Sequence, residues 1–323
     1  MNSLGTNNPE LFLGIDAGGS KTEAWLGHRN PEGVSLLGKG LAGPANLTVD
    51  GLDKAGQQVL LATERAFAAA NLPRSQTTRA CLCLAGCGRN EERQQVQQWA
   101  FARRLGLDVM VCSDAEILLA ASRPLESTEI VSAGIGLIAG TGSIAWGRAD
   151  DGRTMRCGGW GPLLGDEGSG YAIAVSALKA VCTIADGRDT DPVLLAEVLS
   201  AIDRDSVSQI VPWAYASSRS RDELASLAPM IFAIADSSPI AQHIIHQASD
   251  ALAQQVSNLV HRLQLENYFL AVAGGVLVNQ VDYRQLLQQH LHRLDCPPAK
   301  IGVVLAPVLG ALRIAALSHP KNR

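Results

Sequence analysis

The chain has 323 residues, of which 47% are hydrophobic and 18% charged, and its formal net charge at pH 7 is −4. This length exceeds one compact core of the usual size, so two domains of about 150 residues are expected. The composition excludes a disordered chain, and the slightly acidic balance offers no basic field for binding nucleic acid.

Membrane association and disulfide bonding are not expected. No uninterrupted apolar run is long enough to span a bilayer, and residues 1–9 resemble a short polar leader rather than a signal peptide. The seven cysteines are odd in number and scattered along the chain, which argues against a disulfide framework. We therefore expect a soluble cytoplasmic protein.

The first motif joins an apolar run to a glycine-rich turn. Residues 11–15 are apolar or small, Asp16 follows, and residues 17–22 contain paired glycines, two hydroxyls and a lysine. This pattern predicts a buried strand leading to a phosphate-binding turn, because glycines let backbone N–H groups approach an anion. Asp16 would then lie where a magnesium ion or its waters bind. An ordinary glycine-rich hairpin explains the same residues, and this alternative stays open.

A Walker-type loop is the competing interpretation of this turn. Ser20 stands between Gly19 and Lys21, which breaks the Walker spacing by one residue. Residues 23–28 also lack the helical periodicity that must follow such a loop. A strand–turn–strand hairpin fits better.

The next predicted elements are a third strand, a loop and a helix. Residues 34–39 can form the strand, and the glycine and proline content of 40–46 predicts the loop. Asn46 could bind a sugar hydroxyl there or could simply form the turn. Residues 52–71 have apolar side chains at helical spacing, with Pro73 just beyond.

A strand at 79–84 and a polar helix at 90–105 follow in the order of an α/β unit. A metal site at Cys81, Cys83 and Cys87 is the alternative interpretation of this segment. However, Cys81 and Cys83 alternate with leucines, and no second cysteine pair or histidine pattern supports metal binding. We expect these cysteines in the core.

The strand expected at 107–112 delivers Asp114 to its carboxyl end, which is the edge where open α/β sheets bind ligands. Asp114 could act as the N-cap of a helix at 115–122 or as a catalytic base facing a substrate hydroxyl. The residues alone leave both roles open.

The opening pattern then recurs. Residues 135–139 predict a buried strand, 140–143 form a tight turn of glycines and hydroxyls, and 144–147 return as a strand. A duplicated fold whose two hairpins face one phosphate chain explains the recurrence. We place the domain boundary in the polar connector 123–129, which gives a smaller lobe of 10–122 plus 307–319 and a larger lobe of 123–306.

Residues 157–171, here called the glycine-rich block, contain too many glycines for packing alone. Asp166 and Glu167 stand before the helix expected at 172, so either carboxylate could cap it. A carboxylate beside an exposed tryptophan, here Trp160, is also a common way to hold sugar hydroxyls.

Helices dominate the following segment. Helical periodicity is expected over 172–184, 193–201, 207–216, 221–235 and 240–263. His243, His246, His290 and His292 lack an intervening glutamate motif, so we expect them on the surface.

Near the end of the chain, a strand at 268–273 runs into Gly274 and Gly275, where a flat base could lie against the backbone. A helix at 279–293, a strand at 301–305 and a closely packed helix at 307–317 complete the expected elements.

These motifs together resemble the N-acetylglucosamine kinase family, a BadF/BadG/BcrA/BcrD-type ATPase branch of the sugar kinase, actin and heat-shock chaperone superfamily. The resemblance runs from Leu11 to about Leu317. Residues 16–22 and 140–143 are similar to the two phosphate motifs, 273–276 to the adenosine motif, and 157–170 to the block specific to amino-sugar kinases. The resemblance implies an α/β fold of two ribonuclease-H-like, actin-like ATPase domains with a cleft between them.

The resemblance also implies a role for individual residues. Asp114 would be the base that takes the proton from the sugar 6-hydroxyl, and Asp16 would order Mg²⁺ through water. The implied sugar pocket comprises Asn46, Gly86, Gly159, Trp160 and Asp166. The implied ATP site comprises Gly18, Gly19, Ser20, Lys21, Thr22, Gly140, Thr141, Gly142, Ser143, Gly274 and Gly275.

The implied activity is ATP-dependent phosphorylation of N-acetylglucosamine, with a small amino sugar as the partner and neither nucleic acid nor membrane involved. Glucosamine kinase is the nearest alternative. An ATPase activator of acyl-CoA dehydratases and a non-catalytic sugar sensor are alternatives of other classes. A homodimer is compatible with the sequence.

Overall fold

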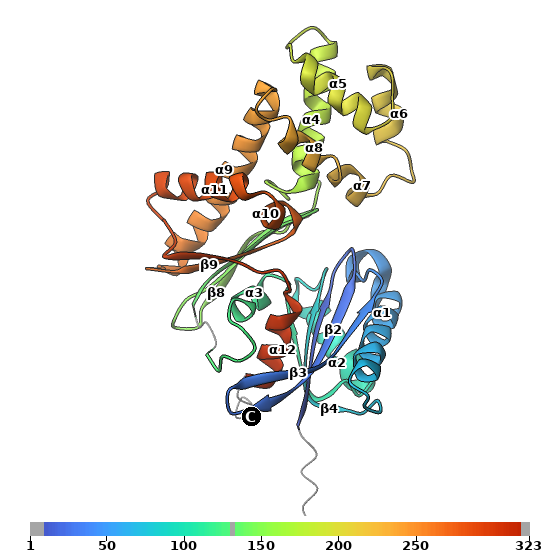
Figure 1. The fold of residues 1–323 in the computed structure, drawn as a ribbon, viewed down its shortest axis with the longest axis vertical. Coiled ribbons are helices and arrows are strands. Elements are labelled where there is room, and N and C mark those ends of the chain that lie inside the picture. The colour runs from blue at the N-terminus through green and yellow to red at the C-terminus, as the bar shows by residue number, and fades with distance from the viewer. Residues whose placement is uncertain (1–9, 130–132, 318–323) are drawn as a thin grey trace, which may run out of the picture. The chain divides into compact units, whose positions relative to one another are not determined.

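The structure is a computed structural model that describes residues 10–129 and 133–317 (Figure 1). These residues form two compact units. Unit 1 lies within Met1–Val131 and Val304–Arg323, and unit 2 lies within Ser132–Val303. The expected leader at 1–9 and residues 318–319 of the expected smaller lobe lie outside the described residues.

Unit 1 is built on a mixed five-stranded sheet in the order β3-β2-β1-β4-β5. The strands are β1 (Leu11–Ala17), β2 (Thr22–Asn30), β3 (Gly33–Ala42), β4 (Thr77–Leu84) and β5 (Gly106–Cys112). β1, β2 and β3 pair in antiparallel fashion, whereas β1, β4 and β5 run parallel. The expected first hairpin is therefore confirmed, although 40–42, expected in a loop, continue β3.

The sheet of unit 2 repeats this plan in the order β8-β7-β6-β9-β10. The strands are β6 (Gly134–Ala139), β7 (Ser143–Arg148), β8 (Thr154–Gly158), β9 (Phe269–Ala273) and β10 (Lys300–Val303). β6, β7 and β8 are antiparallel, and β6, β9 and β10 are parallel. Two mixed sheets of matching topology confirm the predicted α/β class and the duplicated hairpin.

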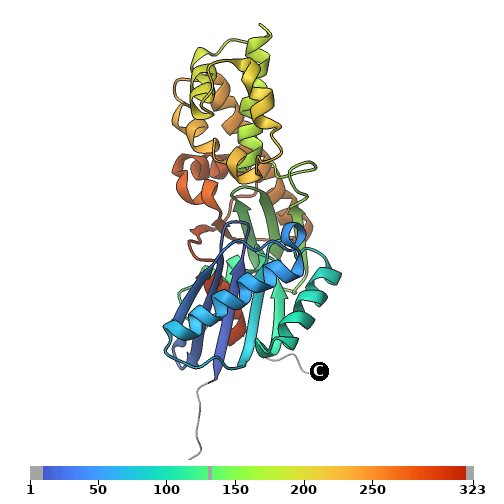
Figure 2. The same ribbon diagram turned by 90° about the vertical axis from the view of Figure 1, so that its right-hand side faces the viewer.

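Side chains of β1 alternate between two faces of the unit 1 sheet. Leu13 and Ile15 belong to the core formed with α1 (Leu47–Ala69) and α2 (Asn90–Ala102), and Figure 2 shows α1 lying across its face of the sheet. Phe12 packs on the other face with α3 (Glu116–Ala121) and α12 (Val308–Leu317). Only glycine fits at Gly14, because a Cβ there would lie 2.2 Å from the backbone nitrogen of Leu312.

The helix α12 also binds the connector 123–129. Arg313 is fully buried, and its guanidinium donates hydrogen bonds to the carbonyl oxygens of Pro124, Ser127 (2.8 Å) and Glu129. The sequence-based lobes, 10–122 plus 307–319 and 123–306, differ from units 1 and 2 chiefly in this connector, which packs on unit 1.

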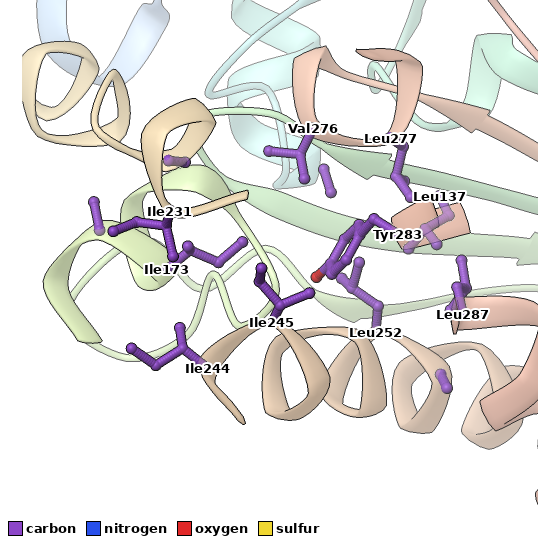
Figure 3. Packing of buried hydrophobic residues seen from close by; sticks show 14 of the residues in the cluster. Leu137, Ile173, Ile231, Ile244, Ile245, Leu252, Val276, Leu277, Tyr283 and Leu287 are labelled. Carbon is purple, nitrogen blue, oxygen red and sulfur yellow. The ribbon is translucent and has the colours of Figure 1, made fainter. Parts of the chain in front are cut away.

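Unit 2 carries most of the helices. They are α4 (Gly170–Ala185), α5 (Pro192–Ala201), α6 (Ile210–Ala214), α7 (Arg221–Ala225), α8 (Ala228–Ala233), α9 (Pro239–Leu263), α10 (Gly275–Asn279) and α11 (Val281–Arg293), with a 3₁₀ turn at Val207–Gln209. Tyr283 lies in their core near Leu137, Leu252 and Leu287 (Figure 3). No helix of the described residues is both long and apolar enough to cross a membrane.

Several expected helices are interrupted. The helix expected at 221–235 is split into α7 and α8, with Pro229 in the first turn of α8, where its missing N–H does no harm. The helix expected at 207–216 is likewise made of two pieces. The helix expected at 279–293 is confirmed as α11, and the short helix α10 precedes it.

His290 corrects the expectation that all four helical histidines lie on the surface. Its side chain is buried, and its Nδ1 lies 3.1 Å from the Oδ1 atom of Asp250. His243, His246 and His292 are exposed as expected. Local periodicity could not identify the partner of His290, because Asp250 belongs to α9 and His290 to α11.

Replacing Arg313 by methionine should destabilise unit 1. Arg313→Met keeps much of the buried volume but leaves connector carbonyls without their donor, so we expect the free energy of unfolding to fall by about 3 kcal/mol. Urea titration monitored by circular dichroism would measure the loss. Arg188→Met, at an exposed position in unit 2, is the control and should change stability by less than about 0.5 kcal/mol. Equal stability of both variants would show that the connector contacts contribute little.

Candidate active site

The carboxyl edge of the first sheet brings Asp16 and Asp114 together. Asp16 pairs in register with Cys83 of β4, and Cys83 pairs with Cys112 of β5. Asp114 follows two residues after Cys112, so both carboxylates stand at the edge where parallel α/β strands bind ligands. The expected strand ends are therefore confirmed, and they place the two acids in one region of unit 1.

Burial and neighbouring charges, including that of Asp114, act on the carboxyl of Asp16. Burial, the negative charge of Asp114 and then that of Glu23 raise the pKa of Asp16 from 3.8 to about 7, whereas Lys21 acts in the opposite direction. A divalent cation would relieve this excess of buried negative charge, and carboxylate oxygens are the ligands that Mg²⁺ prefers. The donor set thus fits the expected magnesium ion.

Asp114 does not cap a helix. Its Oδ1 atom accepts a hydrogen bond from the N–H of Ala115 at 3.1 Å, but α3 begins at Glu116 with no side-chain cap. Burial raises the pKa of the Asp114 carboxyl above its usual value. The capping alternative left open by the sequence therefore finds no support, and a partly desolvated carboxyl remains at the sheet edge.

Two loops join the acids at this edge. Asn46 forms a parallel β-bridge with Ala85, and the N–H of Ala45 donates to the Gly18 carbonyl at 2.8 Å. Gly86 follows Ala85 with a φ of +87°, a conformation that favours glycine. The structure therefore brings Asn46 and Gly86 to the same edge as Asp16.

The residues of the first turn differ in accessibility. Gly19 and Ser20 are exposed, and Lys21 forms an ion pair of 3.2 Å with Glu23. Thr22 is buried, and its hydroxyl donates to the carbonyl of Gly43 at 2.8 Å. The Thr22 hydroxyl therefore holds the fold of unit 1, while the other side chains of the turn remain open to a ligand.

In unit 2, the second turn lies against the expected adenosine motif. A Cβ at Gly140 would lie 3.5 Å from the nitrogen of Gly275. Gly274 has a φ of +90°, and a Cβ there would lie 2.4 Å from the carbonyl oxygen of Ala139. The approach at Gly274 requires glycine, and both approaches place the two expected nucleotide motifs side by side.

The glycine-rich block also folds onto the second turn. The hydroxyl of Ser143 donates to the Glu167 carbonyl at 2.7 Å, and its N–H approaches Oδ1 of Asp166 at 3.3 Å. The N–H of Gly159 donates to the Ser143 carbonyl at 3.1 Å. Ser169, rather than Asp166 or Glu167, caps α4, so the two acids are not needed as caps.

Trp160 stands out from this block, with 63% of its surface exposed. The guanidinium of Arg156 lies over the indole, 4.4 Å from the ring centroid, and one of its nitrogens is 3.3 Å from the Gly159 carbonyl oxygen. An exposed aromatic ring with a cation beside it can hold a polar ring-shaped ligand that carries negative charge.

Two site residues were missed by the sequence analysis. Arg221 donates to Oδ2 of Asp166 at 2.6 Å, and Asp222 accepts a hydrogen bond of 2.6 Å from the Thr141 hydroxyl. Both belong to α7, far along the chain from their partners. The helix expected from residue 221 starts where α7 starts, with a capping box of Ser220 and Glu223, but nothing in the local sequence identifies what the helix contacts.

Comparison with known proteins places the chain in a family context. Residues 13–315 match the model of the BadF/BadG/BcrA/BcrD ATPase family. An N-acetylmuramic acid/N-acetylglucosamine kinase of Clostridium acetobutylicum is 30% identical over 312 residues, which cover 90% of this chain and 93% of that protein. An N-acetyl-D-glucosamine kinase of Dictyostelium discoideum is 26% identical over 95% of this chain and 98% of that protein.

Solved structures agree in fold. A Chromobacterium violaceum protein assigned as a candidate N-acetylglucosamine kinase superposes with a TM-score of 0.73 at 24% identity, covering 94% of this chain and 98% of that one. A ROK hexokinase from Thermus thermophilus gives a TM-score of 0.54 at 17% identity, covering 94% and 97%. The resemblance inferred from the motifs is thus confirmed.

The raised pKa of Asp16 predicts a pH-dependent stability in the absence of divalent cations. Between about pH 4 and pH 7 the folded protein holds a proton on Asp16 that the unfolded chain has lost, so the Asp16 contribution to stability falls as pH rises through this window. Asp16→Asn removes the free-energy cost of ionising this buried carboxyl. We expect this variant to be more stable than the wild type at pH 8, by on the order of 2–4 kcal/mol, and equally stable near pH 4.

Urea unfolding at the two pH values would measure this difference. Asp108→Asn, an exposed position in β5 of the same sheet, is the matched control and should follow the wild type at both. A stability gap for Asp16→Asn that does not change with pH would contradict the prediction.

Proposed function

The chain belongs to the BadF/BadG/BcrA/BcrD ATPase family, and we propose that it is an amino-sugar kinase that transfers the γ-phosphoryl group of ATP to the 6-hydroxyl of N-acetylglucosamine. One observation carries the proposal: Asp16 and Asp114 meet at the carboxyl edge of one sheet, beside the loops that contain Asn46 and Gly86. The activities named for the two curated relatives support the same reaction class.

Asp114 is the general base of the proposed reaction. Its carboxylate takes the proton of the sugar 6-hydroxyl while the oxygen attacks the γ-phosphorus, the new O–P bond forms, and the bond to the β-phosphate oxygen breaks to release ADP. Burial raises the pKa of the Asp114 carboxyl above its usual value, which makes the carboxylate a stronger base than an exposed aspartate.

Asp16 would hold Mg²⁺, directly or through water. The ion supplies charge neutralisation for the phosphates when it is bound. No group of three His, Cys, Asp or Glu side chains suited to a metal occurs among the described residues, so most ligands would be water and phosphate oxygens, as Mg²⁺ prefers. The remaining nucleotide contacts are assigned to the amide-rich first and second turns.

The charges of the glycine-rich block favour an acetamido sugar over a free amine. Asp166 already has a cationic partner in Arg221, and a second cation, Arg156, covers one face of Trp160. The ammonium of glucosamine would meet positive charge here, whereas an uncharged acetamide would not. This arrangement supports N-acetylglucosamine over glucosamine. Use of ATP also supports action in the cytoplasm.

Arg156 favours a second candidate substrate, an N-acetylated amino sugar bearing a carboxylate. The Clostridium acetobutylicum relative is named for N-acetylmuramic acid as well as N-acetylglucosamine. The guanidinium of Arg156 is exposed beside Trp160, where a carboxylate substituent on a stacked sugar could accept its hydrogen bonds.

Asp114→Asn tests the proposed base. This variant keeps the shape of the side chain but cannot accept the proton, so we expect kcat to fall by about 10²-fold or more while the sugar Kd stays within about threefold. Steady-state ADP release and calorimetric sugar titration would measure the two quantities.

Asp108→Asn, at the exposed position on β5, should keep wild-type kinetics. A wild-type protein that binds sugars but is as inert toward ATP as Asp114→Asn would indicate a sensor. Absence of any sugar-dependent ADP release together with a coloured iron–sulfur protein would favour the dehydratase activator.

Arg156→Gln tests the acidic substrate. We expect the KM for N-acetylmuramic acid to rise about tenfold, because one charge-assisted hydrogen bond is lost. The KM for N-acetylglucosamine should stay within about twofold of the wild-type value. Trp160→Ala should instead weaken the binding of both sugars, because the indole ring would contact the pyranose that they share. Equal effects of Arg156→Gln on both sugars would exclude a carboxylate contact at this position.

A further inference from the structure

The short helix α7 contacts two parts of unit 2 with consecutive residues. Arg221 reaches Asp166 in the glycine-rich block, and Asp222 reaches Thr141 in the second turn. Under the proposed function, the block serves the sugar and the turn serves ATP. Residues of one helix therefore contact a polar side chain in each of the two subsites.

The contact between Arg221 and Asp166 fixes a buried carboxylate. Asp166 is only 4% exposed and has a φ of +63°, a conformation uncommon for a residue other than glycine. Its Oδ2 atom accepts a 2.6 Å hydrogen bond from Arg221, and both oxygens lie 3.0 Å from the position of a Cβ on Gly142. The carboxylate is thus held against the second turn with its charge balanced.

The contact between Asp222 and Thr141 fixes the turn itself. The Thr141 hydroxyl donates to Oδ1 of Asp222 at 2.6 Å. Thr141 lies between Gly140 and Gly142, and glycines on both sides give the backbone wide conformational freedom. A side-chain anchor at the middle residue restricts how the amides of the turn are oriented.

The helix α7 is itself firmly placed. Ser220 and Glu223 form a reciprocal capping box, with hydrogen bonds of 2.7 and 3.1 Å. Arg219 lies 4.1 Å from the centroid of the Trp213 ring and pairs with Glu223 at 3.0 Å. The Arg221 guanidinium lies 5.8 Å from the centroid of the Tyr171 ring in α4. These contacts hold the helix independently of the two subsites.

We propose that Arg221 and Asp222 are positioning residues that keep the sugar-binding carboxylate and the phosphate-binding turn in their working geometry. Arg221 balances the charge of Asp166 so that the carboxylate remains ionised and aimed before a sugar arrives. Asp222 holds Thr141 so that the turn presents its amides to a phosphate. Preorganisation of this kind lowers the cost of binding, because less freedom is lost when the ligand enters. This inference rests on the proposed function.

The test uses three single substitutions on the full chain. Arg221→Gln should raise the KM for N-acetylglucosamine about tenfold with the KM for ATP within about twofold. Asp222→Ala should raise the KM for ATP about fivefold and leave the sugar KM nearly unchanged. Arg188→Gln, at an exposed position of unit 2 outside α7, is the control and should change neither KM.

Two further readouts separate positioning from a general loss of structure. Asp166 faces Arg221 of α7, the Ser143 N–H of β7 and its own neighbour Glu167. Because the positive charge of Arg221 lowers the pKa of the Asp166 carboxyl, loss of Arg221 should raise this pKa. The acidic limb of the pH profile of sugar kcat/KM should therefore move to higher pH in Arg221→Gln and return toward wild type in Arg221→Lys. The effects of Arg221→Gln and Asp166→Asn should also be less than additive, because both break one interaction.

The outcomes distinguish this inference from the function on which it rests. A wild-type protein that phosphorylates no amino sugar would overturn the proposed function. Calorimetric titration with ADP would still test Asp222, through weaker ADP binding by Asp222→Ala than by Arg188→Gln. An active wild type in which Arg188→Gln matches Arg221→Gln and Asp222→Ala, or in which Asp222→Ala binds ATP more tightly, would overturn the inference itself.

Discussion

The desolvation of two neighbouring carboxylates is the constraint on which the candidate site depends. Asp16 and Asp114 come from strands separated by one neighbour, and burial together with the charge of the other acid raises the pKa of Asp16 to about 7. Such a pair costs folding free energy unless a proton or a cation relieves it. Unit 1 tolerates this cost because helices cover both faces of the sheet and fix the strands that carry the acids.

The two sheets have matching topologies, so the same kind of turn occurs in each unit. Each unit places a glycine-rich turn between its first two antiparallel strands, and each turn is held by hydrogen bonds from neighbouring loops. Each unit also carries polar side chains near its sheet: Asp114 follows β5 in unit 1, and the glycine-rich block with Asp166 begins at the end of β8 in unit 2.

The sequence predicted those features that depend on local pattern. Apolar runs and turn residues predicted the two hairpins, the parallel strand that leads to Asp114, and a strand that runs into Gly274 and Gly275. The structure contains each of these features. The contacts of Arg221, Asp222 and Arg313 did not follow, because each joins residues far apart in the chain. The burial of His290 was mispredicted for the same reason, since its partner Asp250 lies on another helix.

The packing of α12 on β1 also constrains the order in which the two units can complete their folding during synthesis. Unit 2 is one continuous segment, whereas unit 1 needs Leu312 against Gly14 and Arg313 against the connector before its second face is covered. During synthesis, one apolar face of the first sheet therefore remains uncovered until the residues beyond 304 have been made. By that point all five strands of unit 2 have already been made. Because exposed apolar surface promotes aggregation, we expect the earliest-made part of the nascent chain to be the most vulnerable to it.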